Sequence, residues 1–273
     1  MIRLFFALIS SGALLAQHYE IVNMGVASRE RASNVFGRYT ELVERLKESI
    51  TNEGIQGDVK LRILERESDI TSGFANGSID VAVVSPITYL VMRSRGLPVD
   101  IVGAEIRYVN VVDEAVIVTP ISVSIQRLDQ LQGRSFALGP ANDPLFDWCA
   151  RAEMAKVGLN REQVTLKSFD NFERMSEMIQ MGRYQAGILP KSFVTKPDHP
   201  FRVLAECKAP NRLWVIRRDL IPFTRRGIEQ TLLEIKDPRV LNRIGIEGID
   251  PLDEAELVDL EQVVRKAMVF NSK

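Results

Sequence analysis

The sequence predicts an α/β fold made of two lobes of related build. Strand-like and helix-like segments alternate along the chain, which is typical of sheets flanked by helices. One pattern also occurs twice, at residues 77–86 and 182–190: a helix ends at glycine, and a buried strand follows and closes with proline. The composition, 45% hydrophobic and 26% charged, is ordinary for a globular protein. Together these observations favour two units, each a mixed sheet flanked by helices.

Individual elements follow from hydrophobic periodicity. Apolar residues recur at helical spacing from Val35 to Ile50, whereas residues 79–84 form a continuous apolar run suited to a buried parallel strand. Asp143 and Pro144 are typical of a helix start. The other expected strands are 19–26, 58–64, 135–138, 201–204 and 213–216, with one more between Gly182 and Pro190. The other expected helices are 69–75, 87–95, 172–179, 222–234 and 253–268.

An extended apolar segment at residues 109–119 separates the two halves, and we interpret it as the hinge crossing between lobes. Residues 18–108 then form the first part of lobe 1, and residues 120–205 form lobe 2. We expect residues 206–273 to supply the return crossing and C-terminal helices that pack on lobe 1.

Residues 1–16 have the pattern of an export signal. Arg3 provides the positive charge, and an uncharged apolar run extends to Ala16. We expect the mature chain to begin between Leu14 and His18. No cysteine follows the run, so no lipid anchor is indicated, and no later stretch is apolar for long enough to cross a bilayer. We therefore expect a soluble periplasmic protein.

The two cysteines, Cys149 and Cys207, allow one disulfide at most. Neither belongs to a CxxC motif or lies near a histidine, which disfavours zinc binding and thiol redox chemistry. The sequence leaves their pairing open, and we expect two buried, reduced thiols.

Charge and motif content disfavour several functions. The formal net charge of −1 provides no basic surplus for a nucleic acid. Only two histidines are present, His18 and His199, and no motif of a hydrolase, metalloprotease or nucleotide-binding loop occurs. We expect a protein that is not an enzyme, with no catalytic residues, no metal site and no cofactor.

Several stretches together resemble a known family, the periplasmic substrate-binding proteins of phosphate/phosphite/phosphonate ABC transporters. The resemblance implies the type 2 periplasmic-binding fold, in which two lobes joined by two hinge strands close on a small molecule. It also implies an ABC transporter permease as partner, and we expect a monomer. The matching stretches, in this order, are residues 24–28, 77–82, 85–89, 128–139 and 214–220.

The resemblance points to a first half-site at Ser85, Thr88 and Tyr89. Members of the family place a hydroxyl and an aromatic ring at this helix start, where unpaired backbone N–H groups suit an oxyanion. The alternatives are that the Thr88 hydroxyl bonds its own backbone and that Tyr89 belongs to the core.

The second half-site departs from the family, which has a turn rich in serine and threonine there. This chain has Asn142, Asp143 and Phe146 instead, with Asp147 one residue further on. The carboxylates occupy the position of an anion and would repel one. We therefore expect a ligand that is cationic or carries hydroxyl groups rather than a simple phosphonate. The alternative for Asp143 is a helix cap.

Further candidates are less well placed by the resemblance. The family often has a histidine near the position of Asn171 and Phe172, and Trp214 could add to an aromatic cleft. Lys191 follows a strand of the second lobe and is the remaining candidate to pair with an anion. A core position for each ring and a solvated Lys191 are the alternatives.

The sequence therefore predicts a protein that captures a small molecule between two lobes and delivers it to an ABC transporter. Because lobe closure can also be sensed by a second protein, the alternative partner is a membrane sensor histidine kinase.

Overall fold

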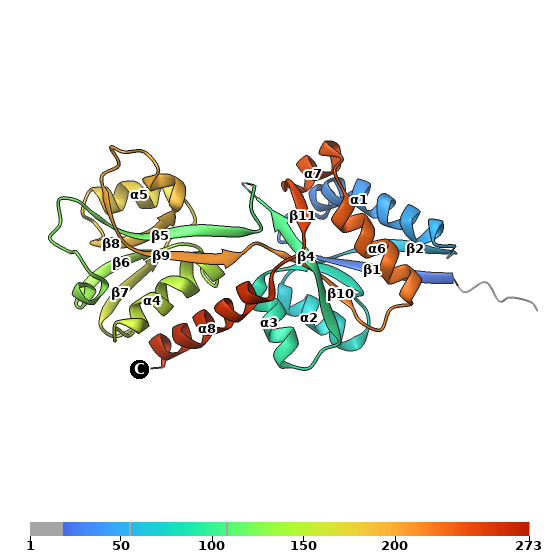
Figure 1. Cartoon of the computed structure of the whole chain (residues 1–273), viewed down its shortest axis with the longest axis horizontal. Coiled ribbons are helices and arrows are strands. Elements are labelled where there is room, and N and C mark those ends of the chain that lie inside the picture. The colour runs from blue at the N-terminus through green and yellow to red at the C-terminus, as the bar shows by residue number, and fades with distance from the viewer. Residues whose placement is uncertain (1–18, 55, 108, 273) are drawn as a thin grey trace, which may run out of the picture.

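The computed structural model describes residues 19–54, 56–107 and 109–272. The expected export signal and its cleavage position lie outside the described residues. The chain forms two sheets, each with helices on both faces, and the sheets lie at opposite ends of an elongated molecule (Figure 1). This arrangement confirms the predicted α/β fold with two mixed sheets.

Lobe 1 is built on a sheet of six strands. Helices α1 (Ala32–Asn52), α6 (Pro222–Glu234) and α7 (Pro238–Ile244) cover one face, and α2 (Glu67–Asn76) and α3 (Pro86–Ser94) cover the other. In spatial order the strands are β11 (Gly248–Asp250), β4 (Val99–Ile106), β10 (Leu213–Arg217), β3 (Val81–Val84), β1 (Tyr19–Ala27) and β2 (Gln56–Leu64).

Lobe 2 is built on a sheet of five strands. One face carries η1 (Leu128–Leu131), the π-helical segment η2 (Pro144–Cys149) and α4 (Ala150–Lys156), and the other carries α5 (Phe172–Gln180) and η3 (Lys191–Val194). In spatial order the strands are β7 (Val164–Ser168), β6 (Arg134–Leu138), β8 (Ala186–Pro190), β5 (Val112–Pro120) and β9 (Phe201–Pro210).

Five strands of each sheet share one topology. Strands β2, β1 and β3 are parallel neighbours in lobe 1, as β7, β6 and β8 are in lobe 2. The next strand of each sheet, β10 in lobe 1 and β5 in lobe 2, runs antiparallel to both of its neighbours, and β4 and β9 follow it. Lobe 1 adds β11 at its edge, antiparallel to β4. The repeated helix–glycine–strand–proline pattern corresponds to β3 and β8, which occupy the same central place in their sheets.

Two extended segments cross between the lobes, one between β4 and β5 and one between β9 and β10 (Figure 1). The outward crossing is shorter than the expected segment 109–119, because the apolar residues from Val112 onward form a strand inside the lobe 2 sheet. Likewise β9 stays paired with β5 as far as Pro210, so lobe 2 extends beyond residue 205.

The last helix, α8 (Glu254–Asn271), corrects the expectation that the C-terminal helices all pack on lobe 1. Helices α6 and α7 do pack against α1, but α8 leaves lobe 1 and lies along α4 of lobe 2 (Figure 1). The reason is its apolar face, on which Phe270 is fully buried in the lobe 2 core.

The expectation of reduced thiols is also wrong. Cys149 and Cys207 form a disulfide, with Cα atoms 6.0 Å apart. The bond joins the end of η2 to β9 within the core of lobe 2, and both residues are buried. Sequence spacing could not indicate it, because the two residues meet only through the packing of η2 on the sheet.

Candidate functional site

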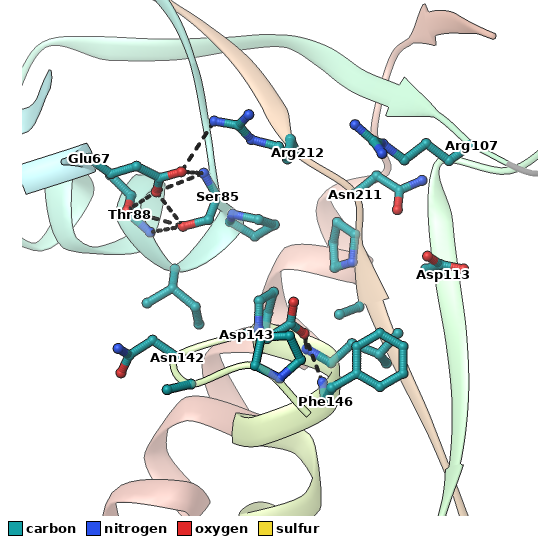
Figure 2. A pocket seen from close by; sticks show the side chains of 18 residues that line it. Glu67, Ser85, Thr88, Arg107, Asp113, Asn142, Asp143, Phe146, Asn211 and Arg212 are labelled. Atoms are coloured by element: carbon teal, nitrogen blue, oxygen red, sulfur yellow. Dashed lines mark hydrogen bonds and ion pairs between the residues drawn. The ribbon is translucent and has the colours of Figure 1, made fainter. Parts of the chain in front are cut away.

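A cavity of about 570 Å³ opens between the lobes, next to the two crossings. Lobe 1 contributes the start of α2 and the start of α3, and lobe 2 contributes the turn from Pro140 to Phe146 (Figure 2). The crossings contribute Arg107, Asn211 and Arg212. A volume of several hundred Å³ is that of a site for a small molecule.

The lobe 1 side of the cavity is organised around the carboxylate of Glu67. Ser85 caps α3 by accepting a hydrogen bond from the Thr88 amide at 3.2 Å. Its own amide donates to Glu67 at 3.0 Å and its hydroxyl donates to the same carboxylate at 2.6 Å. The Thr88 hydroxyl is a further donor to Glu67. Both predicted residues line the cavity, but their hydroxyls bind a carboxylate of the protein.

Both arginines of the cavity are already paired with glutamates. The guanidinium of Arg212 lies 3.3 Å from Glu67 and donates to the Val83 carbonyl at 3.0 Å. That of Arg107 donates two bonds to one oxygen of Glu105, at 2.9 and 3.1 Å. In each pair, the arginine and the glutamate neutralise each other's charge.

On the lobe 2 side, Asp143 is the N-cap of η2. One of its oxygens accepts hydrogen bonds from the Leu145 and Phe146 amides, each at 2.8 Å. Asp147 accepts from the Asn142 amide at 2.9 Å and pairs with Arg151. The backbone donors at this helix start are therefore used by two aspartates. Asp143 is a helix cap and lines the cavity as well.

Two carboxylates of the cavity, Asp113 and Asp143, have no ion-pair partner among the described residues. Burial raises the pKa of both carboxyls above the ordinary aspartate value. Asp147 and Asp113 raise the pKa of Asp143 further, while Arg107 acts in the opposite direction on Asp113. Because the arginines are matched by glutamates, these two aspartates leave an excess of negative charge beside the cavity.

Asn211 ties the two crossings together at the edge of the cavity. Its side-chain amide donates to the backbone carbonyls of Glu105 and Asn110, at 3.1 and 2.9 Å. Its backbone amide donates to the Val111 carbonyl at 2.8 Å. Since Asn211 is buried, these bonds fix the position of each crossing relative to the other.

Two of the predicted ring residues belong to the core of lobe 1. Trp214 is fully buried on β10, packed with residues of α1 and α6 rather than facing the cavity. Tyr89 is 7% exposed and packs with Met92 and Leu257. Helical geometry explains the second case, because consecutive residues point in different directions and Thr88 is the one that faces Glu67.

The remaining predicted residues lie elsewhere in lobe 2. Asn171 caps α5 by accepting from the Arg174 amide at 2.7 Å. The Phe172 ring packs at a tilt against that of Phe146, with ring centroids 4.5 Å apart, and of these two residues Phe146 lines the cavity. Lys191 is paired with Glu114 at 2.9 Å and is therefore not a free cation of the cavity.

The sequence reasoning missed several residues that line the cavity: Glu67, Asp113, Asn211 and Arg212. Arg212 and Asn211 directly precede the predicted strand at 213–216, where a chain returning between lobes must pass. Glu67 follows a strand and begins a helix, a place at which polar side chains reach a sheet edge. Nothing in the sequence shows that it reaches Ser85.

Two lobes of equal topology, joined by two crossings with a cavity between them, define a type 2 periplasmic binding protein. The model of the family described as "ABC transporter, phosphonate, periplasmic substrate-binding protein" matches residues 24–257. The chain belongs to this family, which confirms the resemblance predicted from the sequence. Family members are transport proteins of the periplasm, and none of the described helices is long and apolar enough to cross a membrane.

Solved structures with a similar fold include XAC2383 from Xanthomonas citri. The chloride-bound form is 16% identical, covers 91% of this chain and 99% of its own, and gives a TM-score of 0.72. The ATP-bound form is 15% identical in sequence. Its alignment covers 92% of this chain and 98% of that chain, with a TM-score of 0.71. PhnD1 from Prochlorococcus marinus in complex with methylphosphonate is 13% identical in sequence. Its alignment covers 90% of this chain and 97% of PhnD1, with a TM-score of 0.62. A sequence comparison with curated proteins finds no match.

Proposed function

We propose that this protein captures a small solute with a cationic or hydroxyl-bearing group in the cavity between its lobes. It then presents the solute to the permease of an ABC transporter. The family supports the transport role, and the acceptors of the cavity support the class of solute. A simple phosphonate, the ligand of PhnD1, does not fit these acceptors.

The observation that carries the class of solute is the unpaired state of Asp113 and Asp143 among the described residues that line the cavity. One oxygen of each aspartate accepts from the backbone, and the other is left to accept from a ligand. A bound cation would be attracted to these carboxylates, and an N–H or O–H group of the ligand would donate to their free oxygens, whereas an oxyanion would meet two half-buried carboxylates.

A thermal-shift screen of the mature protein tests the proposal. The compounds are primary amines, quaternary ammonium compounds, polyols, phosphate and phosphonates. A ligand present at a hundred times its dissociation constant stabilises the folded protein by about 2.7 kcal/mol. We expect stabilisation by members of the first three classes and none by phosphate or methylphosphonate.

The variants Asp113→Asn and Asp143→Asn should each weaken the binding of an active amine by about ten-fold or more, because each removes a charged acceptor. Asp170→Asn is the matched control, since Asp170 is an exposed aspartate of lobe 2 outside the cavity. Stabilisation by oxyanions alone, unaffected by either cavity variant, would overturn the proposed class of solute.

A further inference from the structure

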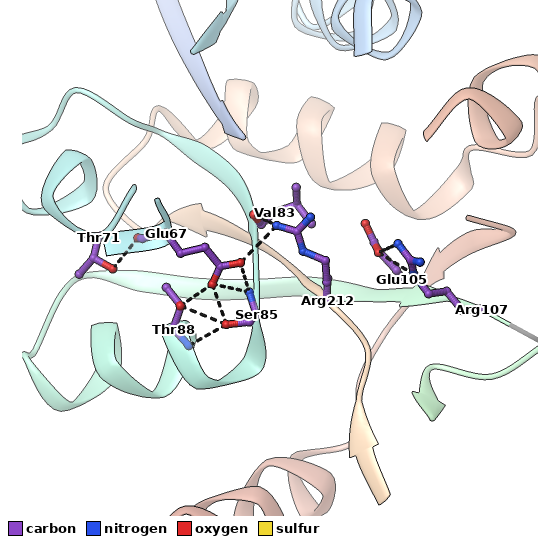
Figure 3. A network of polar contacts seen from close by, with 8 residues as sticks. All are labelled: Glu67, Thr71, Val83, Ser85, Thr88, Glu105, Arg107 and Arg212. Carbon is purple, nitrogen blue, oxygen red and sulfur yellow. Dashed lines mark hydrogen bonds and ion pairs between the residues drawn. The ribbon is translucent and has the colours of Figure 1, made fainter. Parts of the chain in front are cut away.

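Glu67 places a carboxylate at the start of a helix other than its own. It is the first residue of α2, and its side chain reaches the N-terminus of α3 (Figure 3). There it accepts from the Ser85 amide and from the hydroxyls of Ser85 and Thr88, and Arg212 lies beside it. One carboxylate therefore neutralises the N-terminal ends of two helices.

The donors around Glu67 are of the kind that bind a free oxyanion in other proteins. A helix N-terminus offers unpaired N–H groups to an anion, and hydroxyl and guanidinium groups complete such a site. In this chain Glu67 takes up the donors of Ser85 and Thr88. The Ser85 amide and the hydroxyls of Ser85 and Thr88 become available to an oxyanion only if the glutamate moves away.

Displacing Glu67 would be unfavourable for two reasons. The carboxylate is tethered to the protein, so its effective concentration at the helix start is on the order of millimolar or above. Its side chain is also only 25% exposed, and moving it would leave Arg212 without its ion pair. A solute present at micromolar concentration does not compete with such a group.

We propose that Glu67 is a built-in anion that fills the oxyanion position of lobe 1 and so excludes oxyanionic solutes. This inference rests on the proposed binding function for the place of the solute, and it names the residue that determines the specificity. It implies that the donors of an oxyanion site persist beneath Glu67 and can be exposed by one substitution.

Calorimetry with methylphosphonate and with inorganic phosphate tests this proposal on the isolated protein. Wild type should show no saturable binding of either anion at micromolar concentration. Glu67→Ala should gain at least about a hundred-fold in affinity, because two or more charge-assisted hydrogen bonds become available. The double variant Glu67→Ala/Thr88→Val keeps the side-chain shape of Thr88 but lacks its hydroxyl, and it should lose about ten-fold of that gain.

Glu30→Ala is the control for charge, because it removes one exposed carboxylate of lobe 1 outside the cavity. It should leave anion binding unchanged. Thermal unfolding with and without formate provides a second readout, since formate can replace the missing carboxylate. Formate should raise the unfolding temperature of Glu67→Ala and leave that of wild type unaltered.

Micromolar binding of methylphosphonate by wild type would overturn the proposal, as would a Glu67→Ala variant that gains no anion affinity. A variant that folds only with formate or phosphate supports it, and one that stays unfolded in every anion contradicts it. These outcomes are independent of transport. The proposed function fails separately, if no amine or polyol binds to wild type.

Discussion

At the scale of single residues, Asp143 both caps η2 and lines the cavity, and Glu67 both begins α2 and binds the start of α3. The aspartates of the turn at 142–147 were predicted to replace the donors of the family, and Asp143 does line the cavity. The pattern could not show that the same residue is both a cap and a cavity acceptor, because that depends on which of its oxygens meets the backbone. Glu67 was missed because its contacts to Ser85 are made across 18 residues.

The capping aspartates Asp143 and Asp237 should respond oppositely to pH. Burial raises the pKa of Asp143 above its ordinary value of 3.8, so the folded state binds a proton more readily than the unfolded state. The free energy of unfolding then falls as pH rises from 3.8 through the raised value, and the loss persists at neutral pH. In Asp237 the Arg239 guanidinium lowers the pKa to about 2, so its contribution is present at neutral pH and lost as pH falls through about 2.

We therefore expect Asp143→Asn to be at least as stable as wild type at pH 7, because asparagine keeps the acceptor for the Leu145 and Phe146 amides without a half-buried charge. Asp237→Asn should be less stable than wild type at the same pH. Urea unfolding of the three proteins between pH 3 and pH 7 measures both effects. A clear loss of stability in Asp143→Asn at pH 7 would mean that this cap requires its charge.

At the scale of elements, local patterns indicated most helices and strands. The helix of residues 35–50 and the strand at 79–84 were predicted because periodicity and apolar runs are strong there. Strands β4, β7 and β11 were not predicted. Polar residues and Gly103 interrupt the apolar pattern of β4, and its place in the sheet depends on pairing with β10 and β11. The π-helical form of η2 likewise depends on its surroundings.

The disulfide between η2 and β9 gives a prediction at this scale. It joins residues 58 positions apart, so it restricts the unfolded chain considerably. Cys149→Ala/Cys207→Ala should lower the free energy of unfolding by about 2–4 kcal/mol. Denaturant unfolding with and without dithiothreitol measures this, and the reductant should destabilise wild type only. Two free thiols in denatured, unreduced protein would show that the bond is absent.

On the scale of the whole molecule, α8 is a third link between the lobes. Leu257, near its start, belongs to the core of lobe 1, whereas Phe270, near its end, belongs to the core of lobe 2. Its 18 residues span about 27 Å, long enough to reach from one lobe to the other. The C-terminal end of α8 is better anchored than its start, because the Phe270 carbonyl also accepts a hydrogen bond from the Arg161 amide of lobe 2 at 3.0 Å. We infer that α8 moves with lobe 2 when the lobes close.

Closure should therefore disturb the contacts between α8 and lobe 1, among them the ion pair of Arg93 with Glu261 at 2.6 Å. Arg93→Ala removes this link, and Arg265→Ala is the matched control because Arg265 approaches the same glutamate from within α8. Neither change should alter overall stability by more than about 1 kcal/mol, because both arginines are exposed.

Small-angle scattering, with and without an amine found in the screen, tests closure directly. The radius of gyration of wild type should fall when the ligand saturates the protein, because the lobes approach each other about the two crossings.

Arg93→Ala should lower the radius of gyration of the ligand-free protein toward the bound value. It should also tighten ligand binding by no more than about five-fold, the equivalent of about 1 kcal/mol. Arg265→Ala should match wild type in both states. An unchanged radius at saturation would contradict hinge closure while leaving solute binding intact, and identical behaviour of the two arginine variants would show that α8 does not restrain the lobes.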